Sequence, residues 1–361
     1  MTPGTHGDLE TRMSVAAVAA QVERMLGIRP CGVAPIVGGA DASSRLARAD
    51  LPVGAAYPSV VYKAYDDALK YQREARSLAF VNRLGDFAPR VLARDDNELS
   101  LVMELIPGAT LYDLDRADAE RAPLVAVKML AQFHCVAAQH LPAFGEAQGG
   151  KPPQWEPPGA AELVAAWVRA VRAAASTSDV PVPEGKLELV SSVLAQAACA
   201  DPTVVLCDVN PFNFLFACDS VRFVDLATCQ VGPAWIDLDL TRRVGYSEAQ
   251  IAEAHRAYLN HRRAIGNPIG NETHFLTAAD YWEVASALLA AQGFQAVLEG
   301  EYDLKPSVPE HLRRHARFRD DVLADVWAIC NRRPELRAIA EVMNQVLSPD
   351  ICQERYLRSL L

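Results

Sequence analysis

The sequence lacks the features of a secreted, membrane-bound or zinc-binding protein. Its first residues carry Asp8, Glu10 and Arg12 where a signal peptide needs an apolar run. The apolar, Ala-rich stretches are interrupted by charge, as in residues 160–176, which contain three charged side chains, so none could cross a bilayer. The eight cysteines include no Cys-x-x-Cys pair and no zinc-ligand spacing with histidine. We therefore expect a cytoplasmic protein with reduced thiols and no membrane partner.

An excess of basic residues is also missing. The chain has 35 Lys and Arg against 45 Asp and Glu, a net charge of −10, so phosphate backbones would repel it and no nucleic-acid partner is expected. A cationic small molecule would suit this charge. With 361 residues, of which 50% are hydrophobic and 22% charged, the chain is long enough for two globular lobes, and its composition excludes a collagen, coiled-coil or wholly disordered protein.

The first 106 residues predict a small antiparallel sheet with one inserted helix. Residues 1–12 read as a flexible tail, and residues 14–26 have apolar side chains at helical spacing and stop at Gly27. The period then changes to short, partly β-branched runs between Gly and Pro, which is typical of strands. Helical spacing returns only over residues 67–84. The expected strands are residues 33–37, 43–49, 59–65, 90–93 and 99–105.

After Pro107-Gly108 the pattern is mainly helical. Short apolar runs at 203–206, 214–217 and 221–226 interrupt it and predict a β-hairpin near the junction of the lobes. The fold class is therefore α+β, with a nucleotide-binding N-lobe over 13–106 and a helical C-lobe over 107–361; a monomer and a dimer both stay open. The expected helices are residues 123–140, 160–174, 187–198, 247–263, 278–298, 310–330 and 334–347.

The most informative chemistry lies around this hairpin. An apolar strand leads to Asp208, Asn213 follows five residues later, and Asp225 ends the next apolar run. A hairpin would bring these three side chains to one edge. A carboxylate can accept the proton of an attacking hydroxyl, while an amide oxygen and a second carboxylate can hold Mg²⁺ against nucleotide phosphates. Protein kinases share this Asp-x-x-x-x-Asn spacing; the alternative is that Asp and Asn only form turns at strand ends.

Lys63 and Glu74 form a second group with the residue types and spacing found in kinases. Lys63 ends the apolar strand Val60-Val61-Tyr62-Lys63, and Glu74 lies eleven residues later in the following helix. In kinases such a lysine contacts the α- and β-phosphates and the glutamate holds it in place. Lys63 and Glu74 are therefore candidate nucleotide-binding residues.

Two further segments could contact the nucleotide through their backbones. The turn over 36–44 is rich in glycine, and its N–H groups could face phosphates; the candidate residues are Gly38, Gly39 and Ser43. The strand that runs into Pro107-Gly108 could hydrogen-bond a purine at the hinge between the lobes; the candidate residues are Met103, Glu104 and Ile106.

In order and spacing, these elements resemble the aminoglycoside phosphotransferase and choline kinase group, small-molecule kinases with a protein-kinase-like fold. The resemblance spans about residues 33–240 and implies Mg²⁺-dependent transfer of the γ-phosphoryl of ATP or GTP to a hydroxyl of a small molecule. Asp208 would be the catalytic residue, and Asn213 and Asp225 would bind the metal. The further motifs that carry it are residues 38–39, 103–108, 130–134 (Leu-Ala-Gln-Phe-His) and 232–237 (Gly-Pro-Ala-Trp-Ile-Asp).

Four residues at three places depart from the group. Leu206-Cys207 stands where His-Gly or His-Asn usually precedes the catalytic Asp, Ala227 replaces a frequent second acid, and Val231 precedes Gly232 where an acid is common. A degenerate kinase that binds nucleotide without transferring phosphate is therefore the rival hypothesis. Within the enzyme class, an aminoglycoside-like antibiotic, a choline-like amine, a sugar and a nucleoside all stay open as acceptors.

Acids in the C-lobe could hold a cationic acceptor. The candidate substrate residues are Asp237, Asp239, Trp282 and Glu283; Glu272 and Asp280 are further acids in the same segments. Carboxylates and an aromatic ring both attract cations. The competing interpretations are that Asp237 hydrogen-bonds the backbone of the catalytic loop and that Trp282 packs between helices.

Overall fold

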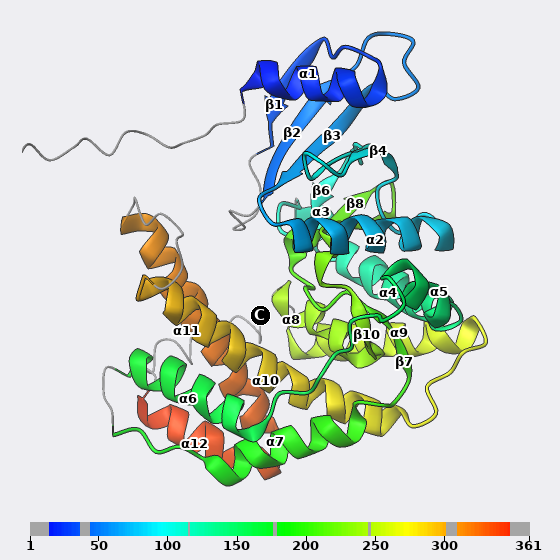
Figure 1. Ribbon diagram of the computed structural model, residues 1–361. Helices are drawn as coiled ribbons and strands as arrows, with labels where there is room; N and C mark the ends of the chain where they lie inside the picture. Colours follow the sequence, from blue (N-terminus) through cyan, green and yellow to red (C-terminus); the bar gives the residue numbers. More distant parts are fainter. Residues whose placement is uncertain are drawn as a thin grey trace, which may run out of the picture.

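A computed structural model describes residues 14–36, 44–114, 116–175, 179–244, 247–300 and 309–346. The chain forms a small N-terminal sheet region above a larger, mainly helical C-terminal part (Figure 1), which confirms the predicted α+β fold. We call the described residues up to Glu104 the N-lobe and those after it the C-lobe. The predicted flexible tail, residues 1–12, and the glycine-rich turn residues Gly38, Gly39 and Ser43 lie outside the described residues.

The N-lobe is a five-stranded antiparallel sheet in the order β1-β2-β3-β5-β4. Helix α1 crosses the strands at the end far from the C-lobe, and α2 lies between the sheet and the C-lobe (Figure 1). The elements are α1 (Val15–Leu26), β1 (Gly32–Pro35), β2 (Ser44–Asp50), β3 (Ser59–Tyr65), α2 (Ala68–Leu84), β4 (Val91–Asp95) and β5 (Ser100–Glu104).

The two N-lobe helices begin and end at residues that satisfy their free backbone groups. Ser14 caps α1 by accepting from Ala17 N at 3.0 Å, and Asp67 caps α2 by accepting from Leu69 N at 2.7 Å. Helix α1 ends at Gly27, whose φ of 69° lies in the left-handed region that glycine adopts without strain. Local sequence therefore fixes both helices.

Strand β3 is covered on both faces. The alternation of its side chains between these faces decides where Lys63 points. Val60, Tyr62 and Ala64 belong to the hydrophobic cluster beneath α1. Successive side chains of a strand point to opposite faces, so Lys63 and Tyr65 lie on the face toward α2 and the C-lobe, where Tyr65 joins the main core. The period of two thus directs the lysine to the junction of the lobes.

The C-lobe is built around long helices and contains two small sheets. Strands β6, β8 and β9 form one sheet, and β7 pairs with β10. The strands are β6 (Ala109–Thr110), β7 (Pro202–Val205), β8 (Phe214–Ala217), β9 (Ser220–Phe223) and β10 (Gln230–Pro233). The helices are α3 (Arg116–Ala119), α4 (Ala122–Ala138), α5 (Leu141–Ala147), α6 (Ala160–Ala174), α7 (Glu184–Ala197), α8 (Leu240–Arg243), α9 (Glu248–Ala264), α10 (Glu272–Leu298), α11 (Pro309–Arg332) and α12 (Arg337–Val346), with 3₁₀ turns η1 (Pro211–Asn213), η2 (Leu226–Thr228), η3 (Ala234–Asp239) and η4 (Pro334–Leu336).

Most predicted elements are present, and the differences have local reasons. The predicted strand 221–226 ends at Phe223, because Asp225 takes a left-handed conformation and a 3₁₀ turn follows. Helix α10 begins at Glu272, six residues before its predicted start, since Asn271 caps it by accepting from His274 N at 3.0 Å. The sequence analysis did not predict α5 or β10, which are short elements that gain their stability from tertiary contacts.

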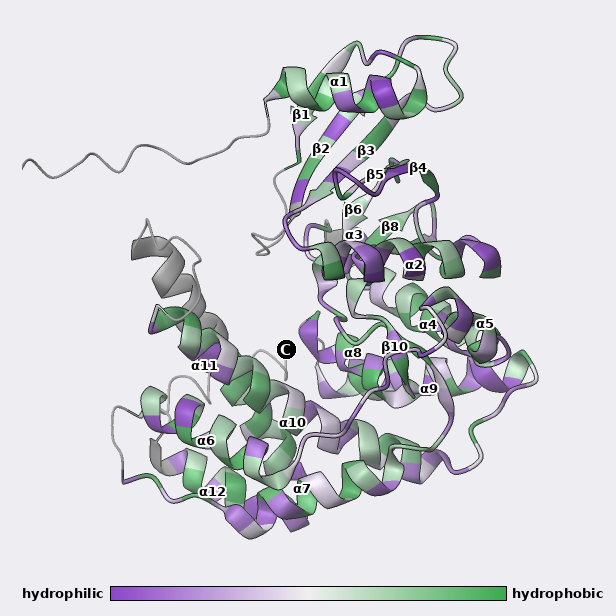
Figure 2. Ribbon diagram, viewed as in Figure 1, coloured by the Kyte–Doolittle hydropathy of each residue, from purple (hydrophilic) through white to green (hydrophobic). Residues whose placement is uncertain are grey.

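One continuous core joins the C-lobe to the lower face of the N-lobe sheet. Figure 2 shows α10 largely hydrophobic, whereas α2 alternates hydrophobic and hydrophilic residues. Helix α10 is buried along most of its length because α6, α7, η3 and α11 all pack on it. None of the described helices combines the length and hydropathy that crossing a bilayer requires.

Candidate active site

The loop between β7 and β8 carries Asp208 and Asn213. The 3₁₀ turn η1 folds this loop back, and Asn213 Nδ2 donates to the Asp208 carbonyl at 3.2 Å. Asn210 supports the turn by accepting from Phe212 N at 3.2 Å, the local bond that this residue type favours. The spacing of five residues is therefore that of one compact turn, which places both side chains on the same loop.

Asp225 reaches the same place from the following strand. Val224 N donates to Asn213 O at 2.9 Å, so the residue before Asp225 is hydrogen-bonded to the end of the Asp208 loop. Asp225 has φ 58° and ψ 61°, a left-handed conformation that Asp tolerates better than most residues. The structure thus brings Asp208, Asn213 and Asp225 together, as the sequence predicted.

Lys63 connects the N-lobe to this group. Its Nζ lies 2.9 and 2.7 Å from the two carboxylate oxygens of Glu74 and 3.1 Å from Asp225 Oδ1. Burial by itself would lower the pKa of Lys63, but the two carboxylates outweigh burial and hold that pKa above its ordinary value. The lysine therefore stays charged at the junction of the two lobes.

Arg243, at the end of α8, is a neighbour of Asp208 that the sequence analysis did not identify. The protein around the Asp208 carboxyl partly desolvates it, which raises its pKa. The positive charge of Arg243 opposes this rise, and the negative charge of Asp225 adds to it. Arg243 Nε donates to Asp239 Oδ2 at 2.8 Å, and Ser286 Oγ donates to the same oxygen at 2.9 Å. Only the tertiary fold brings α8 and α10 to the Asp208 loop, so no sequence signal pointed to Arg243.

Replacing Arg243 by glutamine should move the acid limb of kcat/KM to higher pH. The change removes the positive charge that opposes the raised pKa of Asp208, so the carboxyl would be protonated at a higher pH than in the wild type. A pH profile of kcat/KM measures this. Arg121→Gln is the control, since Arg121 pairs on the surface with Asp118 and Asp219. An unshifted acid limb in Arg243→Gln would contradict the electrostatic role.

Asp237 holds the backbone just before Asp208. Its Oδ2 accepts from Leu206 N at 2.8 Å and its Oδ1 from Cys207 N at 3.0 Å. Cys207 has a φ of 64°, a left-handed conformation that explains why Gly or Asn suits this position in the resembled group. Gln230 Nε2 lies 2.9 Å from Cys207 Sγ. The Leu206-Cys207 departure therefore keeps a sharply turned loop, stabilised by side-chain contacts.

We expect Asp237→Ala to lower the free energy of unfolding by about 2–6 kcal/mol, because two buried N–H groups would lose their acceptor at about 1–3 kcal/mol each. Asp237 is fully buried, so water could not replace the carboxylate. Urea denaturation followed by tryptophan fluorescence measures the change. A loss below about 1 kcal/mol would show that the loop relaxes and finds other partners.

The four residues predicted to contact substrate all make contacts within the protein. Asp237 binds the loop backbone, and Asp239 binds Arg243 and Ser286. Glu283 is buried and paired with Arg242, and burial raises its pKa to about 8. Trp282 packs edge-on against Trp155, with ring centroids 5.4 Å apart. These contacts tie the four side chains to the rest of the C-lobe, and a direct contact with a substrate stays a prediction.

The two further acids are paired as well. Glu272 accepts from Arg263 on the surface, at 2.8 Å, and Asp280 binds Arg333. The carboxylates named for a cationic acceptor are thus neutralised by arginines or committed to backbone amides. Net charge alone did not reveal this, because it does not report which acids have partners.

The predicted hinge residues follow β5 at the boundary of the lobes. Met103 is buried in the core, while Glu104 pairs with Val60 at the end of the strand. Ile106 lies in the segment 105–108, which joins β5 to β6 outside any strand. This placement suits a backbone contact with a purine, which stays a prediction.

Ala227, which stands where the resembled group often has an acid, is a packing residue in this structure. It is buried in η2, which packs against α2. An acid at this place would need a partner to offset its desolvation. Ala227 therefore serves packing between the lobes.

The donors around Asp208 fit a magnesium ion. Asp225 offers a carboxylate that already attracts the Lys63 ammonium, and its side chain is 27% exposed. Asn213 uses its Nδ2 within the loop, which leaves an amide oxygen as a ligand. No three His, Cys, Asp or Glu side chains gather into a metal site in the part of the chain that the structure describes. Mg²⁺ is commonly held by one or two protein oxygens together with nucleotide phosphates and water, so this donor set is sufficient.

Solved structures share this fold. A choline/ethanolamine kinase family protein from Mesorhizobium loti superposes with a TM-score of 0.59 at 17% identity, over 91% of this chain and 99% of that one. Amicoumacin kinase hAmiN, in complex with AMP-PNP, Ca²⁺ and Ami, gives 0.58 at 13% identity, over 87% and 93%. Macrolide 2′-phosphotransferase MphH from Brachybacterium faecium gives 0.55 at 17% identity, over 85% and 97%. At these identities the likeness concerns the fold.

No curated protein matches the sequence. A family match nevertheless extends into both lobes: it runs from the end of β1 through the Asp208 loop to just after α9. Residues 35–266, more than half of the chain, match the phosphotransferase enzyme family known as APH, and the chain therefore belongs to this family of phosphotransferases.

Proposed function

We propose that the protein transfers the γ-phosphoryl of ATP or GTP to a hydroxyl of a small polar molecule. The observation that carries this proposal is the position of Lys63. Its Nζ contacts Glu74 in the N-lobe and Asp225 in the C-lobe, within 3.1 Å of both, and Asp225 is linked through Asn213 to the Asp208 loop. A fixed cation beside carboxylate and amide oxygens is the arrangement that binds triphosphate and metal together.

In this mechanism each side chain has one task. Lys63, held by Glu74, would bind the nucleotide phosphates, with 13–106 as the nucleotide-binding lobe and 107–361 supplying the acceptor site. Asp208 would orient the acceptor hydroxyl and accept its proton. Asn213 and Asp225 would hold Mg²⁺, which when bound supplies positive charge against the phosphate oxygens. Catalysis would come mainly from positioning and charge stabilisation.

We further propose that the acceptor is an aminoglycoside-like antibiotic or a related amine or sugar. Support comes from the acidic net charge of −10 and from the similar structures, which are named as a macrolide phosphotransferase, an amicoumacin kinase and a protein of the choline/ethanolamine kinase family. Because the C-lobe acids considered above are already paired, a cationic acceptor would have to be recognised by other groups. Since the donor is a nucleoside triphosphate, we also propose that the reaction takes place in the cytoplasm.

A transfer assay with γ-labelled ATP and GTP tests the proposal. The acceptors should cover three classes: cationic amino-sugars and amino-alcohols, neutral sugars and macrolides, and nucleosides. We expect labelled product with at least one class, dependent on Mg²⁺. Nucleotide-induced thermal stabilisation without labelled product in any class would overturn the enzyme proposal in favour of a nucleotide-binding module, the reading that the Leu206-Cys207 and Ala227 departures suggested.

A further inference from the structure

A chain of hydrogen bonds through the core reaches the Asp208 loop from α9. It begins at Arg262 on α9, which is 1% exposed. Two guanidinium nitrogens bind the Asp201 carboxylate, each at 2.9 Å, and Nη1 also donates to Tyr258 Oη at 3.1 Å. Asn267 accepts the remaining bonds, from Nε at 2.9 Å and from Nη2 at 3.0 Å. All five N–H groups of Arg262 are therefore engaged, and its position is fixed.

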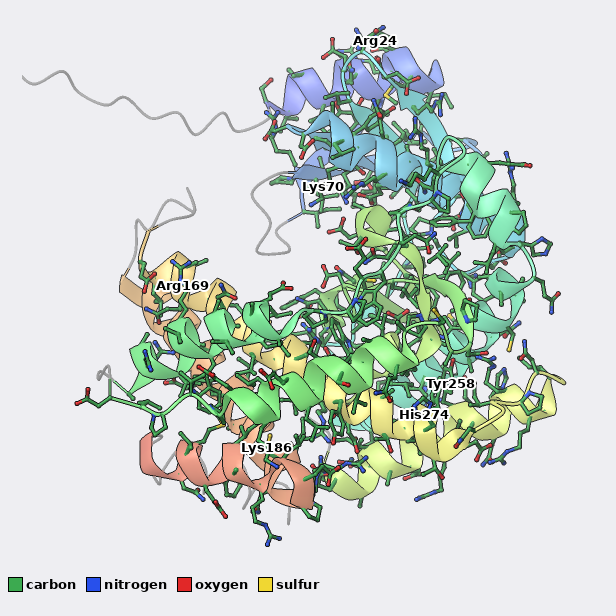
Figure 3. All side chains as sticks on the ribbon, turned by 60° about the horizontal axis from the view of Figure 1, so that its bottom comes forward. Arg24, Lys70, Arg169, Lys186, Tyr258 and His274 are labelled. Carbon is green, nitrogen blue, oxygen red and sulfur yellow. The ribbon has the colours of Figure 1, made fainter. Side chains whose placement is uncertain are left out.

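The chain continues through the core. Tyr258 Oη lies 2.8 Å from His134 Nδ1, and His134 Nε2 lies 3.0 Å from Asp237 Oδ2. Asp237 in turn accepts from the amides of Leu206 and Cys207. Tyr258, His134 and Asp237 are each fully buried, and Figure 3 labels Tyr258 among the packed helices of the C-lobe. Water therefore cannot substitute for any of these links.

With a neutral imidazole on His134, the donors and acceptors along this chain follow one order. Arginine donates and cannot accept, so Tyr258 Oη accepts from Arg262 and donates to His134 Nδ1. Burial raises the pKa of Tyr258, so the hydroxyl keeps the proton that it donates. His134 then carries its proton on Nε2 and donates it to Asp237. Each link fixes the orientation of the next, up to the two amides that precede Asp208.

Packing alone does not account for these polar groups. The Tyr258 ring stacks on Phe275 with centroids 5.7 Å apart, a contact that phenylalanine would make equally well. A buried hydroxyl and a buried guanidinium must instead recover the free energy lost on leaving water. Their bonds end at Cys207, which is held at a φ of 64°. The chain therefore supports a backbone conformation that is unfavourable without it.

We propose that Tyr258 and Arg262 are positioning residues for phosphoryl transfer, which act through His134 and Asp237 to hold the Asp208 loop in its turned conformation. This role rests on the proposed function of Asp208. It differs from a purely structural role in one measurable respect: removing the Tyr258 hydroxyl should disturb the loop and the rate rather than nucleotide binding, because Lys63, Glu74 and Asp225 lie outside the chain of bonds.

Tyr258→Phe is the decisive variant, because it removes the hydroxyl and keeps the ring. We expect kcat to fall about tenfold, since small displacements of a catalytic group have effects of this order or larger, while the KM for nucleotide stays within about twofold. Tyr281→Phe is the matched control. Tyr281 is also buried on a C-lobe helix, and its hydroxyl binds Glu335 at 3.1 Å, away from the chain. It should leave kcat unchanged.

A second measurement does not depend on catalysis. Amide hydrogen exchange in the segment 204–209 should be faster in Tyr258→Phe than in Tyr281→Phe, with exchange in β5 of the N-lobe similar in the two variants. If exchange is faster in Tyr258→Phe but the wild-type protein transfers no phosphate, the positioning chain is upheld and the proposed function is refuted. Wild-type kcat together with unchanged exchange in Tyr258→Phe would refute the positioning chain and leave the proposed function intact. An equal loss of kcat in both variants would also refute it.

Discussion

Replacing Asp208 by asparagine should lower kcat about 10²–10⁴-fold, the usual contribution of a positioned general base. Asparagine has nearly the same shape but cannot accept the proton of the acceptor hydroxyl. Asp208 is exposed on its loop, but the surrounding protein partly desolvates its carboxyl and so raises its pKa, and the charge of Asp225 adds to this rise. Loss of its negative charge should therefore leave the melting temperature unchanged or slightly higher, as is common where a site is built for activity rather than stability.

The measurements are kcat with the acceptor found in the transfer assay, nucleotide affinity and thermal melting. Asp219→Asn is a matched control: Asp219 lies in the β8–β9 turn with φ 63°, a conformation that asparagine also adopts, and its side chain is 68% exposed. The control should keep wild-type kcat. Near-wild-type turnover in Asp208→Asn would remove Asp208 from the mechanism.

Asp225→Asn should weaken nucleotide binding about tenfold or more in the presence of Mg²⁺ and have little effect without it. The variant keeps the side-chain volume and the left-handed backbone at φ 58°, but it loses the charge that would hold the metal. Without Mg²⁺ the affinity for nucleotide should stay unchanged or rise slightly. Removing a carboxylate 3.1 Å from Lys63 Nζ leaves the lysine more available to the anionic phosphates.

Paired nucleotide titrations with and without Mg²⁺ measure this difference, again with Asp219→Asn as the control. If both affinities fell equally, Asp225 would serve only to hold Lys63 in place. That result would leave the roles of Lys63 and Asp208 standing and would move the metal site elsewhere.

The sequence determined the elements whose signals are local. Helices α1 and α2 could be predicted because their apolar residues recur at helical spacing and Gly27 ends the first; in the structure Ser14 and Asp67 cap them. The pairs Lys63–Glu74 and Asp208–Asn213 could be predicted because a strand, a helix and a short turn fix their spacing. Asp225 could be recognised because it follows an apolar run at the end of a hairpin.

Only the tertiary structure decided which charges are free. The acids expected to face a cation proved to be paired with Arg242, Arg243, Arg263, Arg333 or the backbone of the Asp208 loop. Arg243 lies 35 residues after Asp208 in the sequence, and Tyr258 reaches His134 across 124 positions. Such partners are brought together by the packing of α4, α8, α9 and α10, and a charge or hydroxyl carries no local pattern that announces its distant partner. The sequence therefore predicted the chemical groups of the candidate site, whereas the fold determined which of them have internal partners and what holds the Asp208 loop in place.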